Sequence, residues 1–272
     1  MKQFASVACC FAATLFSAVS PARALPREPI RNWVVDYGDT HCTASRSYGT
    51  DEKPLTFGMR LSASGKIVRL MVVRRGSVGD PRHIKVNVTH SATPIKGTAL
   101  RFGSKDRKLD IFWINLERQA LDGIAASERI AIRGEGVEEE FALPQIGAVL
   151  AALQTCNEDL RKYWNVEGAP GATAIATPAR AAKSLAAYLT DEDYPTQALD
   201  EGASGTSRFT LLVDEKGMLK DCTVEETSGI ASLDAVGCGL LAQRAKFTPA
   251  LDAAGKPVRS VVSTAVRWIT TD

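Results

Sequence analysis

The feature that most limits the fold is a series of short apolar and β-branched runs between residues 32 and 143, separated by turn-forming residues. Runs of this length between Gly, Pro, Asp and Ser clusters are typical of antiparallel strands joined by turns. In one run, Ile84, Val86 and Val88 alternate with polar residues, as in a strand with one face in water. We predict a meandering antiparallel sheet with strands at 32–37, 55–61, 67–73, 84–89, 109–114, 129–133 and 137–143.

After Pro144 the spacing of apolar residues changes from two to about 3.6, which predicts a helix over residues 146–163 that closes this β-rich unit. Proline suits the opening turn, where a backbone N–H needs no intrahelical partner. The apolar stripe contains Ile146, Val149, Leu150, Leu153, Cys156 and Leu160.

Residues 1–24 have the three parts of a secretory signal. Lys2 precedes an apolar run at 4–19, and Ala22 and Ala24 occupy the positions that a signal peptidase reads. We predict cleavage after Ala24 and a periplasmic location. The alternative is an uncleaved inner-membrane anchor at 4–19, although about twenty apolar residues are needed to span a bilayer. Without residues 1–24 the chain has 31 basic and 31 acidic residues, which gives no reason to expect nucleic acid or an anionic membrane surface as a partner.

Four cysteines remain after such a cleavage: Cys42, Cys156, Cys222 and Cys238. Four cysteines in an exported chain suggest two disulfides, with three connectivities. Pairing within domains favours Cys42 with Cys156, which would attach a loop after the first strand to the helix, and Cys222 with Cys238. No Cys-x-x-Cys motif is present, so we expect no metal site.

Residues 165–182 are rich in Ala, Gly, Pro and Thr, which predicts a linker between the unit at 25–164 and a second unit at 183–272. The second unit should contain helices at 181–189, 196–199 and 233–245, the last capped by Ser232, and strands at 208–213, 218–225 and 258–269. Asp214 to Gly217 supply the turn between the first two strands, with glycine where a positive φ is needed.

The order of residues in this second unit resembles the C-terminal domain of the TonB family, over about residues 190–270. The resemblance rests on Tyr194-Pro195, Val213-Asp214, Gly217, Ser228-Gly229, Leu233-Asp234, Phe247, Pro249-Ala250, Gly255, Val266 and Trp268. It implies a three-stranded antiparallel sheet with two helices on one side. It also implies periplasmic binding of a short peptide from an outer-membrane transporter, which pairs as an added strand along the sheet edge.

Together, the residue patterns of 25–164 and this resemblance predict an α+β chain: a mainly antiparallel β domain with a closing helix, followed by a small TonB-like domain. The edge strand is 258–269. Val258, Val262 and Val266 are expected to face the core, and the residues expected to meet the partner are Arg259, Val261, Ser263, Ala265 and Arg267. The unit at 25–164 resembles no family that we can name.

Three functions follow from these observations. The first is a periplasmic adaptor that binds a transporter or another envelope protein by strand addition and contributes to transport across the envelope. If residues 4–19 stay in the membrane, the chain is instead a short energy transducer, although it has neither a histidine or charged residue in that segment nor a long Pro-rich spacer. The third is a structural protein that forms a homodimer through sheet edges.

We expect no catalysis and no cofactor. Ser184, Ser228 and Ser232 lie in no Gly-x-Ser-x-Gly motif. The strand-flanking residues His83 and His90 are expected to be solvated, as is His41. The run 138–140 of three glutamates is expected to form a wet strand face.

Overall fold

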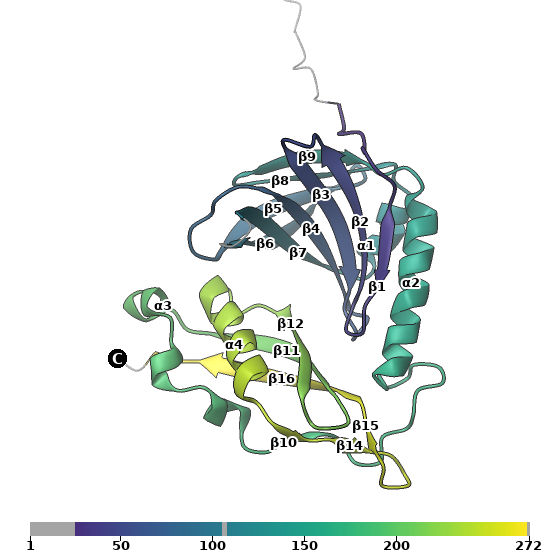
Figure 1. The fold of residues 1–272 in the computed structure, drawn as a ribbon. Helices are drawn as coiled ribbons and strands as arrows, with labels where there is room; N and C mark the ends of the chain where they lie inside the picture. The colour runs from purple at the N-terminus through teal and green to yellow at the C-terminus, as the bar shows by residue number, and fades with distance from the viewer. Residues whose placement is uncertain (1–24, 105–107, 271–272) are drawn as a thin grey trace, which may run out of the picture.

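The computed structural model describes residues 25–104 and 108–270, whose two main sheets lie one above the other in Figure 1. The buried apolar residues form two hydrophobic cores. The predicted signal segment lies outside the described residues. We call the part built around the larger sheet the N-terminal domain and the part built around the smaller sheet the C-terminal domain. The architecture is α+β, as predicted from the sequence.

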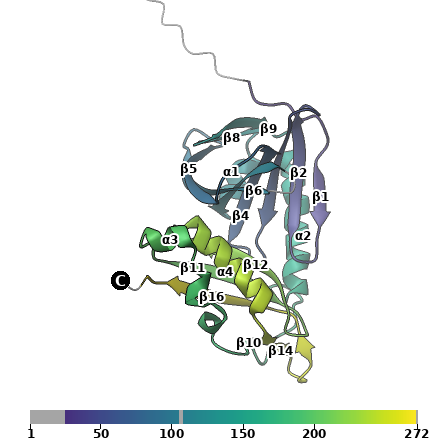
Figure 2. The same ribbon diagram turned by 60° about the vertical axis from the view of Figure 1, so that its left-hand side comes forward.

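The N-terminal sheet has nine antiparallel strands in the order β1-β2-β3-β4-β7-β6-β5-β8-β9 and curves into a half-barrel (Figures 1 and 2). Its core face carries every second residue of each strand, so Val68, Leu70 and Val72 of β4 are fully buried. The strands are β1 Val34–Tyr37, β2 Cys42–Gly49, β3 Pro54–Leu61, β4 Ile67–Arg75, β5 Arg82–Thr89, β6 Ile95–Ser104, β7 Leu109–Glu117, β8 Arg129–Gly134 and β9 Val137–Ala142.

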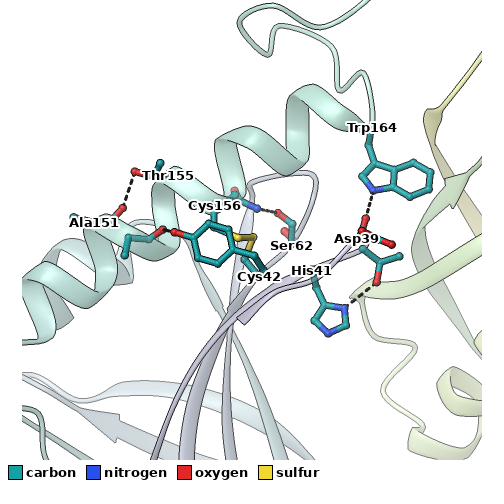
Figure 3. The surroundings of a disulfide bond; sticks show 12 residues. Asp39, His41, Cys42, Ser62, Ala151, Thr155, Cys156 and Trp164 are labelled. Atoms are coloured by element: carbon teal, nitrogen blue, oxygen red, sulfur yellow. Dashed lines mark hydrogen bonds between the residues drawn. A yellow bond between two sulfur atoms is a disulfide. The ribbon is translucent and has the colours of Figure 1, made fainter. Parts of the chain in front are cut away.

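Two helices belong to this domain: α1 Ala120–Ala125 and α2 Ile146–Tyr163. The second has the predicted bounds, and its apolar stripe lies in the core of the sheet. The Cys42–Cys156 disulfide attaches α2 to β2, with the two Cα atoms 6.1 Å apart (Figure 3). The Trp164 indole N–H donates to the Asp39 carbonyl at 2.7 Å, which fixes the end of the helix to the β1–β2 turn.

Three expectations for the N-terminal domain were wrong. Cys42 begins strand β2 rather than lying in a loop. Residues 95–104 form strand β6, although no strand was expected there and the turn-forming residues at 94–97 and 103–106 indicated turns. Of the three glutamates at 138–140, Glu139 and Glu140 are only 8% exposed, because arginines neutralise them: Arg27 and Arg74 approach Glu139, and Arg129 and Arg133 approach Glu140.

The C-terminal sheet has the order β12-β11-β16, with β11 Gly205–Val213, β12 Leu219–Glu226 and β16 Ser260–Trp268. The helices α3 Thr196–Asp200 and α4 Ala231–Arg244 share one core with Phe209, Leu211 and Val213 of β11, as predicted. Short paired strands frame this sheet: β10 Arg180–Ala181 with β13 Phe247–Thr248, and β14 Ala250–Leu251 with β15 Pro257–Val258.

Two positions of this domain require glycine because of the backbone conformation or the space available. Gly217 has φ +73° in the β11–β12 turn, as predicted. At Gly237 of α4, a Cβ atom would stand 2.8 Å from the Phe209 ring, so the helix approaches β11 only because this position has no side chain.

Two helix predictions in the C-terminal domain were wrong. Residues 181–189 are not an α-helix: β10 pairs with β13, and only a 3₁₀ turn, Leu185–Tyr188, follows. The pairing keeps the backbone extended where the alanine content favours a helix. Ser232 is not a cap, because α4 begins one residue before it, at Ala231.

The segment 165–182, expected as a linker, contacts both cores. Val166 and Ala169 are buried in the N-terminal core. Thr177 bridges to Leu251 of β14.

Candidate partner-binding edge

Strand β16 forms one edge of the C-terminal sheet and pairs with β11 along its whole length, from Gly205 opposite Trp268 to Val213 opposite Ser260. Val266 and Trp268 point into the C-terminal core, and Val262 packs against it. The alternate residues point to the opposite face, as the period of two requires. Among the described residues, the other side of β16 pairs with no strand.

The other edge of the same sheet, β12, lies next to the N-terminal domain (Figure 1). Two N-terminal side chains donate hydrogen bonds to the Val224 carbonyl oxygen of β12: Arg69 through Nη2 at 3.4 Å and Asn115 through Nδ2 at 3.3 Å. Arg60 forms an ion pair with Asp221 of β12 at 3.0 Å. Side chains of the neighbouring domain therefore occupy the β12 edge.

The guanidinium groups of Arg60 and Arg69 hold the β12 edge against the N-terminal domain. Burial lowers the pKa of Arg69 to about 10, and burial also lowers the pKa of Arg60, which Asp221 partly offsets. The Arg69 guanidinium remains charged at neutral pH, because a pKa of about 10 is well above 7. Arg60 is also charged, since Asp221 favours its protonated form. Their hydrogen bonds to β12 are therefore charge-assisted, the stronger class.

Two of the five predicted partner-binding residues contact the protein itself. Arg259 pairs with Glu215 at 2.9 Å and lies over the Tyr163 ring, 3.9 Å from its centroid. Val261 packs against the N-terminal core, beside Leu212 of β11. These contacts hold the first part of β16 to the end of α2.

The remaining three predicted residues, Ser263, Ala265 and Arg267, are exposed on the second half of β16. Ile269, just after the strand, is 56% exposed. The candidate edge is therefore the segment 263–267, with its polar side chains on one face and its outer main-chain groups available.

The contact between the two domains was not predicted from the sequence, and His83 is an example. We expected a solvated side chain, but the His83 side chain is only 15% exposed and contacts the C-terminal domain. Its Nδ1 lies 3.0 Å from the Gly229 carbonyl oxygen, and its Nε2 lies 3.7 Å from Oδ2 of Asp234. Leu212 is a signal that could have indicated this interface, because it is an apolar residue on the face of β11 opposite the C-terminal core, and it is 2% exposed.

The second disulfide joins Cys222 of β12 to Cys238 of α4, as predicted, with the Cα atoms 5.7 Å apart. Asp234, in the first turn of α4, accepts hydrogen bonds from the Ser207 hydroxyl, the Thr227 hydroxyl and the Ser228 backbone N–H. The disulfide thus joins β12 covalently to α4, and the hydrogen bonds to Asp234 join α4 to β11 and to the loop between β12 and α4.

Comparison with known families identifies the C-terminal domain. Residues 191–270 match the family model described as the C-terminal domain of the Gram-negative bacterial TonB protein. The resemblance inferred from the residue order is therefore confirmed for this part of the chain. A comparison with curated proteins found no match. In the described part of the chain, no helix is long and apolar enough to cross a membrane.

Proposed function

We propose, from the premise that residues 191–270 form a TonB C-terminal domain, that the protein is a periplasmic adaptor which binds a peptide segment of an outer-membrane transporter or another envelope protein. The peptide pairs with β16 as an added strand. The observation that carries this proposal is the difference between the two sheet edges. Side chains of the N-terminal domain contact β12, whereas Ser263, Ala265 and Arg267 of β16 are exposed and the outer side of β16 pairs with no described strand.

Strand addition needs an edge whose main-chain groups are available, and it needs no catalytic group. The main chain of β16 supplies affinity, while alternate side chains select the sequence of the partner. Ser263 and Ala265 are small and let a strand approach closely. Arg267 places a positive charge at the far end of the edge, which favours a partner with an acidic residue there.

The anchoring of β16 to α2 also favours this function. Asn165 donates a hydrogen bond to the Arg259 carbonyl at 2.9 Å, and the Arg259 side chain is held by Glu215 and Tyr163. An edge that is fixed at one end loses less conformational entropy when a partner strand binds.

Site-specific photocrosslinking tests the proposal. A photoreactive residue is placed at position 263 on the open edge, and a matched control carries it at exposed Lys220 of β12. We expect position 263, and not position 220, to crosslink to the N-terminal periplasmic segment of an outer-membrane transporter in cells. Crosslinks from both positions, or from neither, would contradict strand addition at β16.

The same experiment distinguishes peptide binding from self-association. Crosslinks from position 263 to a second copy of this chain would support a homodimer through β16. The energy-transducer alternative depends on residues 4–19. N-terminal sequencing of the mature protein decides it, since a chain that starts at Leu25 has lost the anchor.

A further inference from the structure

A cavity of about 690 Å³ lies between the two domains. The sheet of the N-terminal domain contributes the face opposite its core, and the C-terminal domain contributes β12 and the first half of α4. The volume falls in the range of sites that bind drug-sized molecules, roughly 300 to 1,000 Å³. The residues that matter for its chemistry are Arg69, Phe102, Trp113, Asn115, Glu225 and Thr98.

One wall of the cavity is aromatic. Phe102 of β6 and Trp113 of β7 meet edge to face, with ring centroids 4.8 Å apart. Arg69 lies over the Trp113 ring, 4.6 Å from its centroid. A solvated sheet face would carry polar residues at these positions, so the aromatic pair indicates an apolar ligand surface.

Arg69 is a buried cation that forms no ion pair with any described residue, although, against the effect of burial, the nearby charge of Asp221 acts to raise its pKa. It is 8% exposed, and it donates to Oδ1 of Asn115 at 2.8 Å and to the Val224 carbonyl. No aspartate or glutamate among the described residues forms an ion pair with it. A buried charge is normally paired, because desolvation without a counter-charge is costly.

Glu225 presents the opposite case. Its Oε1 atom is buried without a hydrogen-bond partner. The other two carboxylates of the cavity wall are satisfied: Glu226 pairs with Arg208 at 2.8 Å, and Asp234 accepts three hydrogen bonds. Among the described residues, therefore, one cation without an ion pair and one carboxylate oxygen without a hydrogen-bond donor lie at a cavity with an aromatic wall.

We propose that this cavity binds a small zwitterion with an apolar body, of about the size of a dipeptide. The ligand carboxylate accepts hydrogen bonds from Arg69, and its ammonium group donates to Glu225. Its apolar side chains lie against Phe102 and Trp113. This site is separate from the β16 edge and is formed only when both domains are present.

Calorimetric titration of residues 25–272 with leucyl-phenylalanine tests the proposal. The N-acetylated and C-amidated forms of the same dipeptide each remove one of its charges. We expect saturable 1:1 binding of the free dipeptide and about tenfold weaker binding of each blocked form, since one charged hydrogen bond contributes roughly 1.5 kcal/mol or more. Free phenylalanine, a shorter zwitterion, distinguishes an amino-acid site from a peptide site. Absence of binding by both zwitterions, or equal binding of free and blocked dipeptides, would overturn the proposal.

Variants assign each charge to its residue. In Arg69→Met the free and amidated dipeptides should bind equally, and in Glu225→Gln the free and acetylated forms should bind equally. The matched control is Arg82→Met, because Arg82 pairs with Glu135 and does not line the cavity. This control should bind like the unsubstituted protein, and loss of binding there would count against the assignment.

A cavity-filling variant keeps the test decisive if Arg69→Met fails to fold. Thr98 is an exposed residue of β6 at the cavity wall, so Thr98→Trp adds volume to the cavity without removing a buried contact. Circular dichroism verifies its fold. We expect this variant to lose dipeptide binding at least tenfold, and unchanged affinity would overturn the location of the site.

Discussion

The two edges of the C-terminal sheet differ in what they contact. On the β12 side, Arg60, Arg69 and Asn115 of the N-terminal domain reach Asp221 and the Val224 carbonyl. On the β16 side, the alternate residues Ser263, Ala265 and Arg267 are exposed beyond the anchored residue Arg259. Exposed edges invite unwanted pairing, and proteins usually protect them. The N-terminal domain therefore covers the β12 edge and leaves the second half of the β16 edge without a paired strand among the described residues.

Removal of the Cys222–Cys238 disulfide should give the largest loss of stability on the β12 side. Replacing Cys222 and Cys238 by alanine releases β12 from α4, and we expect a loss of about 3 kcal/mol in the free energy of unfolding, from loop entropy. Urea denaturation measures it. If hydrogen exchange then accelerates equally in β12 and β16, the two edges are not independent and the comparison fails.

Leu212→Ala should have the next largest effect. Leu212 is 2% exposed and joins the core of the N-terminal domain from the far face of β11. We expect a loss of about 2 to 3 kcal/mol, since truncation leaves a cavity between the domains. The matched control is Ser263→Ala on the open edge, which should change stability by less than about 0.5 kcal/mol. Equal costs at the two positions would mean that the second half of β16 is also covered.

Asp221→Asn should have a smaller effect. It removes the charge that pairs with Arg60, whose side chain is 17% exposed. We expect a loss of about 1 kcal/mol, because water partly screens this pair. Urea denaturation at low and high salt measures the loss, which should shrink as salt increases. A loss that does not depend on salt would show that packing, rather than charge, holds the β12 edge.

A pH dependence at His41 should give the smallest effect. Burial lowers the pKa of His41, and Arg60 lowers it further, while Asp221 and Asp36 raise it. The unfolded chain binds the proton more tightly, with a pKa of about 6.5. The contribution of His41 is therefore fully present above that value and is lost as the pH falls through the folded-state pKa. We expect His41→Gln to reduce the decrease in stability between about pH 7.5 and pH 5. An unchanged loss of stability between these pH values would show that His41 does not contribute to the pH dependence of the β12 contact.

Much of this architecture could be predicted from the sequence, because local patterns encode it. Alternating residues such as Ile84, Val86 and Val88 gave their strand, helical spacing gave α2, and the two disulfides followed from pairing cysteines within domains. Strand β2 was missed because its core positions include small and polar residues, among them Ala44 and Arg46. Strand β6 was missed because Gly97 and Gly103, which lie within it, are residues typical of turns.

The covered edge could not be predicted, because it depends on contacts between residues distant in the sequence. Arg69 and Val224 are 155 positions apart, and His83 and Gly229 are 146 apart. Residue periodicity indicates that a face is apolar, and it does not indicate which segment covers it. Of the five predicted partner-binding residues, the structure leaves Ser263, Ala265 and Arg267 exposed and places Arg259 and Val261 in contacts within the protein.

Amide hydrogen exchange of residues 25–272, with and without a peptide from the N-terminal periplasmic segment of an outer-membrane transporter, tests directly whether a partner strand binds along β16. We expect the peptide to slow exchange of the β16 amides, most strongly around residues 263–267, and to leave exchange in β12 unchanged. Protection confined to β12, or no protection at β16 under saturating peptide, would contradict it.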